Sequence, residues 1–311
     1  MINKFIDFVN EKELGVDSII VTVNGQQYQH FFNEDSLINT RSISKVISCL
    51  GAYMAIESGL YDLNTYVMPF FDDIKITNES NKSKLEKLQI RHLLSLTVGH
   101  EVGLMFSKNI KNMPADTDFI SYILNYDIPH NPGTFFVYNN SATYLLCALT
   151  ERLTGMPFEE WIKDKVFTPL GITDFEWEKS TQNICLGASG LYLKNTDLHK
   201  IAVLLLNNGV YNEQQFIDSE WIKDMYTPKF ITADLKEYAP KQGRCINKMA
   251  YGYNLWISGD NSQKYPKEHY FCDGTDGQFL IVSPKRKMAI TILSHQKDMN
   301  PFYEIFNIFF E

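Results

Sequence analysis

The chain has 311 residues and a formal net charge of −8, with 44% hydrophobic and 21% charged residues. These values are typical of a globular protein with a hydrophobic core, formed by one large domain or two joined ones. The acidic balance lacks the basic surface that nucleic-acid binding requires, and this class of function is therefore excluded.

The N-terminal segment predicts a short amphipathic helix, since apolar residues at positions 5, 8 and 9 share one face. Asp7 and Glu11 interrupt the hydrophobic region that a signal peptide would need. The longest apolar stretches, such as residues 201–206, are far too short to cross a bilayer. We therefore expect no membrane span and a cytoplasmic location.

The five cysteines are widely spaced and none stands in a C-x-x-C pair. Cys49 and Cys147 lie among apolar residues, which predicts reduced cysteines in the core. The seven histidines show no metal-ligand spacing such as H-E-x-x-H. We expect neither a metal nor another cofactor.

The first third of the chain predicts strands followed by a helix. Residues 18–23 and 28–32 are β-rich runs joined by Asn24-Gly25, a strong hairpin signal. A helical pattern then begins at Ser42 and runs to about Ser58, where Gly59 is placed as its C-cap.

The middle of the chain predicts helices. Residues 75–88 are polar and indicate a solvated connection, and from about 85 to 225 the apolar periodicity is mostly helical. The clearest helical segments are residues 143–154, 158–166 and 196–207.

The last third returns to strands and closes with an aromatic helix at residues 303–310. The strands are predicted at residues 251–257, 269–272, 278–282 and 288–293, with a turn at 283–286. This order predicts an α+β fold, in which both chain ends form an antiparallel sheet flanked by helices and a mostly helical region is inserted. We expect residues 1–74 and 245–311 to form a discontinuous sheet domain, residues 75–244 a helical domain, and the active site to lie at their junction.

Ser42 and Lys45 form an S-x-x-K element. Positions i and i+3 share a helix face, so the amine can reach the serine oxygen. The partial positive charge of a helix N-terminus stabilises an alkoxide and lowers the pKa of a nearby lysine. The motif is weak alone, because Ser294 and Lys297 repeat it and an N-cap serine followed by a surface lysine has the same pattern.

The surroundings of Ser42 resemble the serine β-lactamase and penicillin-binding-protein superfamily, in particular class C β-lactamases and related esterases. The resemblance covers about residues 36–295. Its phrases, in chain order, are TRSISK at 40–45, ESGLYDL at 57–63, IRHLLSLT at 90–97, PGTFFVYNN at 132–140 and TPLGI at 168–172. It implies a β-lactamase/transpeptidase-like fold, with Ser42 as the nucleophile and Lys45 beside it.

Tyr138 and Asn140 match the second catalytic element of this superfamily. The resemblance implies that Tyr138 shares proton transfer with Lys45 and that Asn140 binds substrate. A neighbouring ammonium would stabilise the phenolate. The alternative is a tyrosine packed in a loop whose helix is capped by Asn140. We read Arg91 and His92, which precede this element, as structural.

The third element departs from the superfamily pattern. Residues 272–278, CDGTDGQ, stand where a K-T-G or H-x-G triplet is usual, and the cation or ring is missing. We expect Asp273, Gly274 and Thr275 to contact substrate, and the backbone amides of Ser42 and Thr275 to form the oxyanion hole.

The two aspartates of this element bear on the substrate. Asp273 and Asp276 would repel a substrate carboxylate unless Lys241, Arg244 or Lys267 reaches in; alternatively, they reflect turn chemistry alone. We therefore expect weak or absent β-lactamase and D,D-peptidase activity.

Together these features predict a cofactor-independent serine hydrolase that acts on a small-molecule ester, amide or peptide-like substrate through an acyl-enzyme. Two alternatives stay open. One is a β-lactamase or D,D-carboxypeptidase proper, and the other is a catalytically silent binding or sensor module. The oligomeric state is left open, and a monomer is compatible with the sequence.

Overall fold

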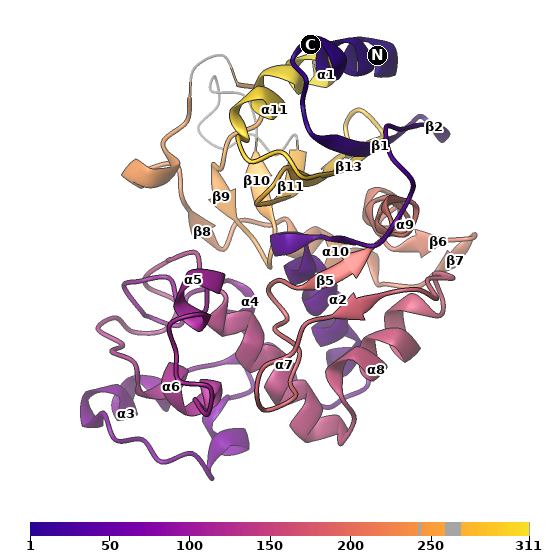
Figure 1. The fold of residues 1–311 in the computed structure, drawn as a ribbon. Coiled ribbons are helices and arrows are strands. Elements are labelled where there is room, and N and C mark those ends of the chain that lie inside the picture. Colours follow the sequence, from indigo (N-terminus) through magenta and orange to yellow (C-terminus); the bar gives the residue numbers. More distant parts are fainter. Residues whose placement is uncertain (242–243, 259–268, 311) are drawn as a thin grey trace. The chain divides into compact units, whose positions relative to one another are not determined.

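The computed structural model describes residues 1–241, 244–258 and 269–310 (Figure 1). The chain divides into two units, each with its own set of contacts. The sheet unit comprises Met1–Ile43, Asp174–Glu176 and Tyr192–Glu311, and the helical unit comprises Ser44–Thr173 and Trp177–Leu191.

The sheet unit is built on an eight-stranded antiparallel sheet with the strand order β2-β1-β13-β12-β11-β10-β9-β8. Because β1 pairs with β13, strands from the two ends of the chain are neighbours, which confirms the predicted origin of the sheet. The strands are β1 (Val16–Val23), β2 (Gln26–Phe31), β8 (Phe230–Ile231), β9 (Ala250–Tyr251), β10 (Trp256–Ser258), β11 (His269–Gly274), β12 (Gln278–Ser283) and β13 (Met288–Ser294).

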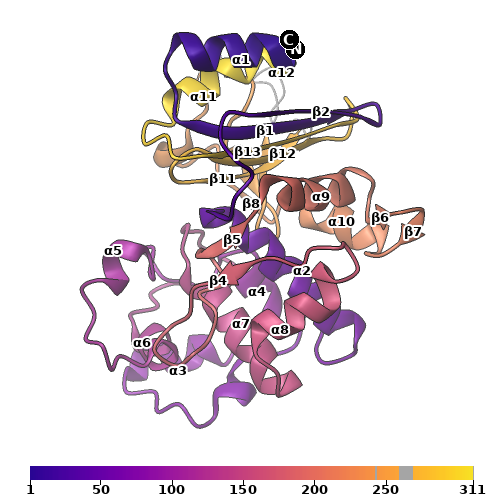
Figure 2. The same cartoon turned by 45° about the vertical axis from the view of Figure 1, so that its right-hand side comes forward.

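Helices cover both faces of this sheet (Figure 2). α1 (Ile2–Glu11), α11 (Asn300–Ile305) and α12 (Asn307–Phe310) lie on one face, and α9 (Asn195–Leu206) and α10 (Ser219–Met225) lie on the other. The rings of Phe5 and Phe309 are 5.8 Å apart, so the first and last helices pack on each other. Cover on both faces explains why β12 and β13 are buried along their whole length.

The β1–β2 hairpin forms at the predicted Asn24-Gly25 turn. Both residues have positive φ, 50° and 80°, as a two-residue turn that matches strand twist requires. The 3-10 turn η1 (Arg41–Ile43) follows the short strand β3 (Ile38–Asn39), which pairs with Tyr192 and Leu193 of β5 (Leu191–Leu193).

The helical unit is centred on α2 (Ser44–Glu57) and α7 (Ser141–Thr154), which pack against each other and are buried over most of their length. Gly59 ends α2 with φ 72°, as predicted. Gly51 lets α8 (Phe158–Ile162) approach α2, because a Cβ at position 51 would lie 2.5 Å from Ile162 Cδ1. The other elements of this unit are η2 (Met68–Phe71), α3 (Glu79–Leu85), α4 (Ile90–Leu94), α5 (Ser107–Ile110), α6 (Phe119–Asn125), α8 (Phe158–Ile162) and the π-helical turn η3 (Lys163–Phe167).

The units differ from the expected domain boundaries of 74 and 245. α2 belongs to the helical unit, whereas α9 and the segment after it belong to the sheet unit. α9 packs on β12 and β13, and this contact buries its apolar face. The sequence shows that a helix has an apolar face but not which element covers that face.

One local expectation was wrong. The strand expected at residues 251–257 is β9 and β10, separated by a turn in which Asn254 has φ 55°. The polar segment 75–88 is largely exposed, as expected, but it also contains α3, in which the buried Asn81 donates hydrogen bonds to the carbonyls of Leu124 and Tyr126. The sequence does not show that this one polar residue forms its hydrogen bonds inside the fold.

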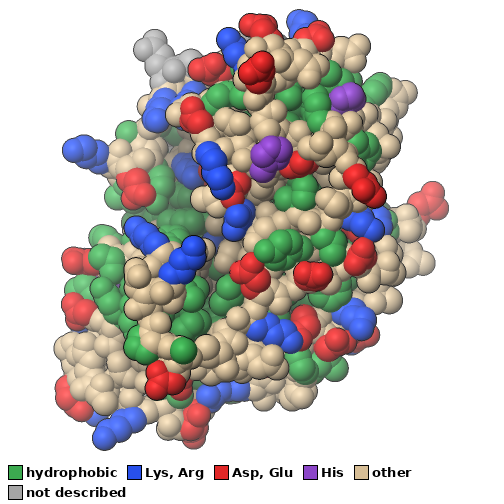
Figure 3. All heavy atoms as spheres, viewed as in Figure 1, with side chains coloured by type: hydrophobic (Ala, Val, Ile, Leu, Met, Phe, Trp, Pro, Cys, Tyr) green, Lys and Arg blue, Asp and Glu red, His purple; other side chains and the backbone are tan. Residues whose placement is uncertain are grey.

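The remaining elements are β4 (Glu176–Trp177), the small hairpin β6 (Val210–Tyr211) and β7 (Gln214–Gln215), and the 3-10 turn η4 (Lys236–Tyr238). On the face shown in Figure 3, cationic and anionic side chains are interspersed. Across residues 1–241, 244–258 and 269–310, no helix is both long and apolar enough to cross a membrane.

Candidate active site

Lys45 is a buried lysine on α2, with 1% of its surface exposed. Its Nζ donates hydrogen bonds to Asn140 Oδ1 at 2.7 Å and to the carbonyl of Ala188 at 3.2 Å. The same nitrogen lies 4.6 Å from the ring centroid of Tyr138. A buried ammonium is costly unless such partners surround it, so the alternative of a surface lysine is wrong. The helical unit by itself brings Lys45, Tyr138 and Asn140 together.

Asn139 and Asn140, at the start of α7, have different hydrogen-bond partners. The Oδ1 of Asn139 accepts the backbone N–H of Ala142 at 2.9 Å and thereby caps the helix. The amide of Asn140 makes no side-chain cap and instead joins Lys45 to the carbonyl of Met105, to which its Nδ2 donates at 3.0 Å. The capping alternative therefore applies to Asn139 and not to Asn140.

The loop 103–106 holds this element in place, and sequence reasoning did not identify it. The Asn140 N–H donates to the Leu104 carbonyl at 3.0 Å, and the ring of Phe106 stacks on Tyr138 with 6.5 Å between centroids. A Cβ at Gly103 would lie 2.5 Å from the Tyr138 carbonyl oxygen, so only glycine permits this approach. Gly103 is the one signal of this loop in the sequence.

The structural reading of Arg91 and His92 is confirmed for the histidine. His92 Nδ1 accepts the backbone N–H of Gln89 at 3.0 Å and completes a capping box at the start of α4. Burial, followed by the charge of Arg91, lowers the pKa of His92 to about 4. The ring is therefore neutral at physiological pH, as an acceptor must be.

Ser42 is the middle residue of η1, which runs directly into α2, and it lies three positions before Lys45. Arg41 anchors this turn within the sheet unit. Its N–H donates to Asn39 Oδ1 at 2.9 Å, and its guanidinium pairs with Asp276 at 2.6 Å. Arg41 has φ 53°, a conformation that non-glycine residues rarely adopt. Contacts on both sides hold the backbone around Ser42 in this unusual conformation.

The third element lies against the same turn. Gly274 ends β11, and a Cβ at this position would lie 2.7 Å from Arg41 Cβ and 2.8 Å from the Thr40 carbonyl oxygen. Glycine is therefore required for β11 to approach η1, and the exposed Thr275 follows it directly. Within the sheet unit, residues 273–275 are thus near neighbours of the Ser42 turn, as a shared oxyanion hole needs.

The two aspartates of the third element are paired with cations, which corrects the expectation that they repel a carboxylate. Asp276 contacts Arg41 and Lys297, each at 2.6 Å, and Asp273 accepts from Lys248 at 2.8 Å. Burial alone would raise the pKa of Asp276, but the hydrogen bond from Lys297 and the charge of Arg41 outweigh it, and the pKa is lowered. Both carboxylates are therefore neutralised locally.

The sequence left open whether Lys241, Arg244 or Lys267 reaches this element. The cations that pair with it are Arg41, Lys248 and Lys297, and Lys267 lies outside the described residues. Asp276 and Gly277 also have positive φ, 66° and 85°, so turn chemistry is confirmed for this pair.

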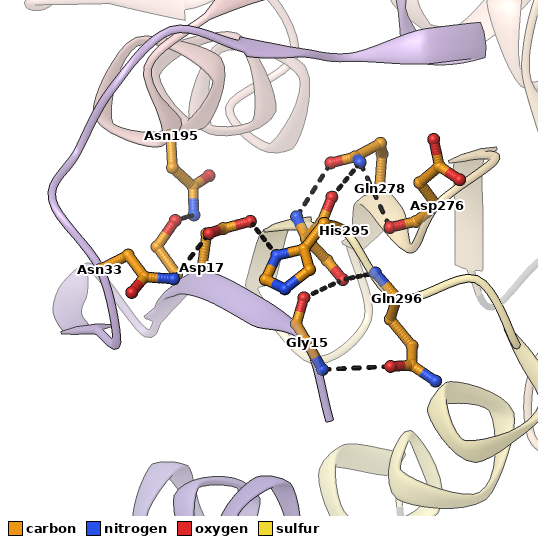
Figure 4. A network of polar contacts seen from close by, with 10 residues as sticks. Gly15, Asp17, Asn33, Asn195, Asp276, Gln278, His295 and Gln296 are labelled. Carbon is orange, nitrogen blue, oxygen red and sulfur yellow. Dashed lines mark hydrogen bonds and ion pairs between the residues drawn. The ribbon is translucent and has the colours of Figure 1, made fainter. Parts of the chain in front are cut away.

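The second S-x-x-K copy is structural. Ser294 is 1% exposed, and its Oγ donates to the Gly15 carbonyl at 2.8 Å and accepts the Gln296 N–H at 3.0 Å. Figure 4 shows this network, in which Gln278 joins the end of β13 to the carbonyl of Asp276. A hydroxyl that already serves two backbone groups is a poor nucleophile, which leaves Ser42 as the candidate.

A sequence model of the Beta-lactamase family matches residues 2–305. The chain belongs to the Beta-lactamase family of serine hydrolases. The predicted family and the β-lactamase/transpeptidase-like α+β fold are thereby confirmed.

Individual relatives are distant. Penicillin-binding protein 4* of Bacillus subtilis (strain 168) is 25% identical over 148 residues, which is 45% of this chain and 30% of that protein. The chain matches between 30% and 42% of the length of its first curated relatives.

Solved structures share the fold. EstCE1, a hydrolase with promiscuous acyltransferase activity, superposes with a TM-score of 0.78 at 14% identity. The match covers 98% of this chain and 96% of the EstCE1 chain. An octameric penicillin-binding protein homologue from Pyrococcus abyssi has a TM-score of 0.75 at 18% identity, over 99% of this chain and 76% of its own.

Proposed function

We propose that this protein hydrolyses a small-molecule ester or amide through an acyl-enzyme on Ser42. The observation that carries the proposal is the buried Lys45, whose ammonium is held by Asn140 and lies over the Tyr138 ring. Apolar residues of similar volume are often as stable as buried ions, so burial by itself does not favour a lysine at this position. A lysine kept there at such a cost points to proton transfer.

The proposed mechanism has two steps. Ser42 attacks the substrate carbonyl while its proton passes to Tyr138, whose phenolate the Lys45 ammonium stabilises, or to Lys45 in its neutral form. The oxyanion is stabilised by the backbone amides of Ser42 and Thr275. One such donor is typically worth about 3 kcal/mol. The proton then passes to the leaving group, and water hydrolyses the acyl-enzyme. Asn140 and residues 273–275 contact the substrate.

Hydrolysis of an ester or amide is favoured over β-lactamase or D,D-carboxypeptidase activity because the third element lacks the usual lysine or histidine. EstCE1, a hydrolase of the same fold, has promiscuous acyltransferase activity. The similarity to Penicillin-binding protein 4* supports the alternative, a protein that acts on penicillins or D-alanyl peptides. A cytoplasmic location is part of the proposal and is supported by the sequence, in which Asp7 and Glu11 interrupt the hydrophobic region that a signal peptide would need.

Intact-mass spectrometry after incubation with a fluorophosphonate, p-nitrophenyl acetate and a penicillin tests the proposal. The wild-type protein should gain the mass of the fluorophosphonate adduct, and Ser42→Ala should not. Ser58→Ala, which removes an exposed serine at the other end of the same helix, is the matched control and should label like wild type. Labelling that persists in Ser42→Ala would place the nucleophile elsewhere, and a wild-type protein that none of the reagents labels would favour the binding or sensor module.

A further inference from the structure

Segment 187–191 runs along helix α2 within the helical unit. The Ser48 hydroxyl donates to the Gly187 carbonyl at 2.8 Å. One residue further along the segment, the Lys45 ammonium donates to the Ala188 carbonyl at 3.2 Å. Positions 45 and 48 are about one helical turn apart and share a face, so two consecutive carbonyls each meet one side chain of that face. The register of the segment along α2 therefore decides which carbonyl lies at the ammonium.

This segment depends on side-chain anchors. Gly187 and Ala188 belong to no helix or strand, and both are buried. Buried carbonyls outside regular structure need hydrogen-bond donors from other parts of the chain. The Leu191 N–H donates to Ser44 Oγ at 3.4 Å, which holds the far end of the segment on α2. Ser48 holds the end that leads into Ala188.

Helix α7 fixes the same segment from a second side. Gly187 has φ 70°, and a Cβ at this position would lie 2.5 Å from Cys147 Sγ and 3.2 Å from the Thr143 carbonyl oxygen. Glycine is therefore required where the segment contacts α7. The Cys147 thiol also donates to Ser48 Oγ at 3.8 Å. Because this hydroxyl accepts from α7, its own proton is directed to the Gly187 carbonyl.

Titratable groups lie on the elements that pack around Lys45. Burial raises the pKa of the Cys147 thiol on α7, so the thiol stays protonated and remains a donor. Glu159 on α8 is paired with Lys179. The phenol of Tyr138 lies against the ammonium, with 4.6 Å between Lys45 Nζ and the ring centroid. A test must therefore separate the titration of Lys45 from that of Tyr138.

We propose that Ser48 positions the Ala188 carbonyl on the Lys45 ammonium and thereby sets how tightly the lysine holds its proton. An acceptor aimed at an ammonium stabilises its charged form, so a displaced carbonyl lets the proton leave at a lower pH. Ser48 is fully buried, so it acts through the lysine and is a positioning residue. The inference rests on the proposed function, in which Lys45 takes part in proton transfer.

The pH dependence of kcat/KM for p-nitrophenyl acetate tests the inference, because this constant reports the titrations of the free enzyme. In Ser48→Ala the limb that reports Lys45 should move to lower pH by about 1 unit, since a hydrogen bond to a charged group is worth this much. The direction is the same whether Lys45 acts as a neutral base or as an ammonium beside the Tyr138 phenolate, because both limbs follow the protonation of the lysine. Ser48→Thr keeps a hydroxyl and should retain the wild-type profile.

Thr150→Val is the matched control. Thr150 is fully buried on α7, and its hydroxyl donates to the Leu146 carbonyl at 2.9 Å. The variant loses a buried hydrogen bond to a carbonyl, as Ser48→Ala does, and should keep the wild-type midpoint. Ser48→Cys has a weaker donor and should shift the midpoint in the same direction by less, which provides the test if Ser48→Ala does not fold. A wild-type midpoint in both Ser48→Ala and Ser48→Cys, or an equal shift in Thr150→Val, would overturn the role of Ser48.

A measurement without turnover separates this inference from the proposed function. Nuclear magnetic resonance of ¹⁵N-labelled lysine side chains in Ser42→Ala follows Lys45 Nζ, whose signal is identified by its loss when Lys45→Gln is added. A titration midpoint that falls when Ser48→Ala is added supports the inference even if the wild type hydrolyses no ester. An unchanged midpoint counts against it. A wild-type protein that a fluorophosphonate does not label would contradict the proposed function and leave this result unaffected.

Discussion

The hydrogen bond between Lys45 and Asn140 offers a sharp test of the site. It is 2.7 Å long and links two buried side chains, and the other acceptor is the Ala188 carbonyl at 3.2 Å. Asn140→Ala removes the shorter of these bonds and leaves the ammonium under-solvated. A hydrogen bond to a charged group is worth about 1.5–3 kcal/mol. If the bond orients Lys45 in the transition state, kcat/KM should fall roughly 10- to 150-fold.

The assay is steady-state hydrolysis of p-nitrophenyl acetate, with thermal unfolding measured on the same samples. Asn139→Ala is the matched control, because it removes the cap of α7 and should cost about 1 kcal/mol of stability while the Lys45 bond is kept. Asn140→Ala should lose activity beyond its loss of stability, and Asn139→Ala should not. Equal activity per folded molecule in the two variants would refute the role of Asn140 in positioning the lysine.

Three further predictions concern the sheet unit. His199→Asn should flatten the pH dependence of the free energy of unfolding. Burial lowers the pKa of His199 from 6.5 to about 4, so the unfolded chain takes up a proton at a higher pH than the folded protein does. The wild type should therefore lose about 3 kcal/mol of stability as the pH falls from 6.5 to 4. Urea unfolding of both proteins across this pH range tests the prediction. Stability curves of the wild type and the variant that run parallel with pH would contradict it. Ser294→Ala should cost about 1 kcal/mol of stability, because the hydrogen bond to Gly15 is lost. The variant should still react with a fluorophosphonate; a folded variant that is no longer labelled would indicate that Ser294 is the nucleophile. Gly274→Ala should lower kcat about 100-fold, because the added methyl would displace the Arg41 turn, and kinetics equal to wild type would show that the turn tolerates the shift.

Features that depend on neighbouring residues were predictable from the sequence. Asn24-Gly25 specifies its hairpin because both residues accept positive φ, and Gly59 ends α2 for the same reason. The order of the motifs around Ser42, Lys45 and Tyr138 identified the family, since several phrases in one order rarely arise by chance.

Features that depend on contacts between residues far apart in the sequence could not be predicted. Ser42 and Ser294 begin the same motif, and only the contacts of the Ser294 hydroxyl with Gly15 and Gln296 exclude Ser294 as the nucleophile. Asn139 and Asn140 are chemically identical, and only their partners show which one caps the helix.

The charge around the third element (residues 272–278) could not be predicted from the sequence either. From the sequence, Asp273 and Asp276 add negative charge to the site, whereas the fold surrounds them with Lys248, Arg41 and Lys297, residues 25, 235 and 21 positions away. Local chemistry determines turns, caps and motif identity because those interactions lie within a few residues. The charge of the site depends on side chains that only tertiary packing brings together, since electrostatic interactions depend on distance in space and not on separation along the chain.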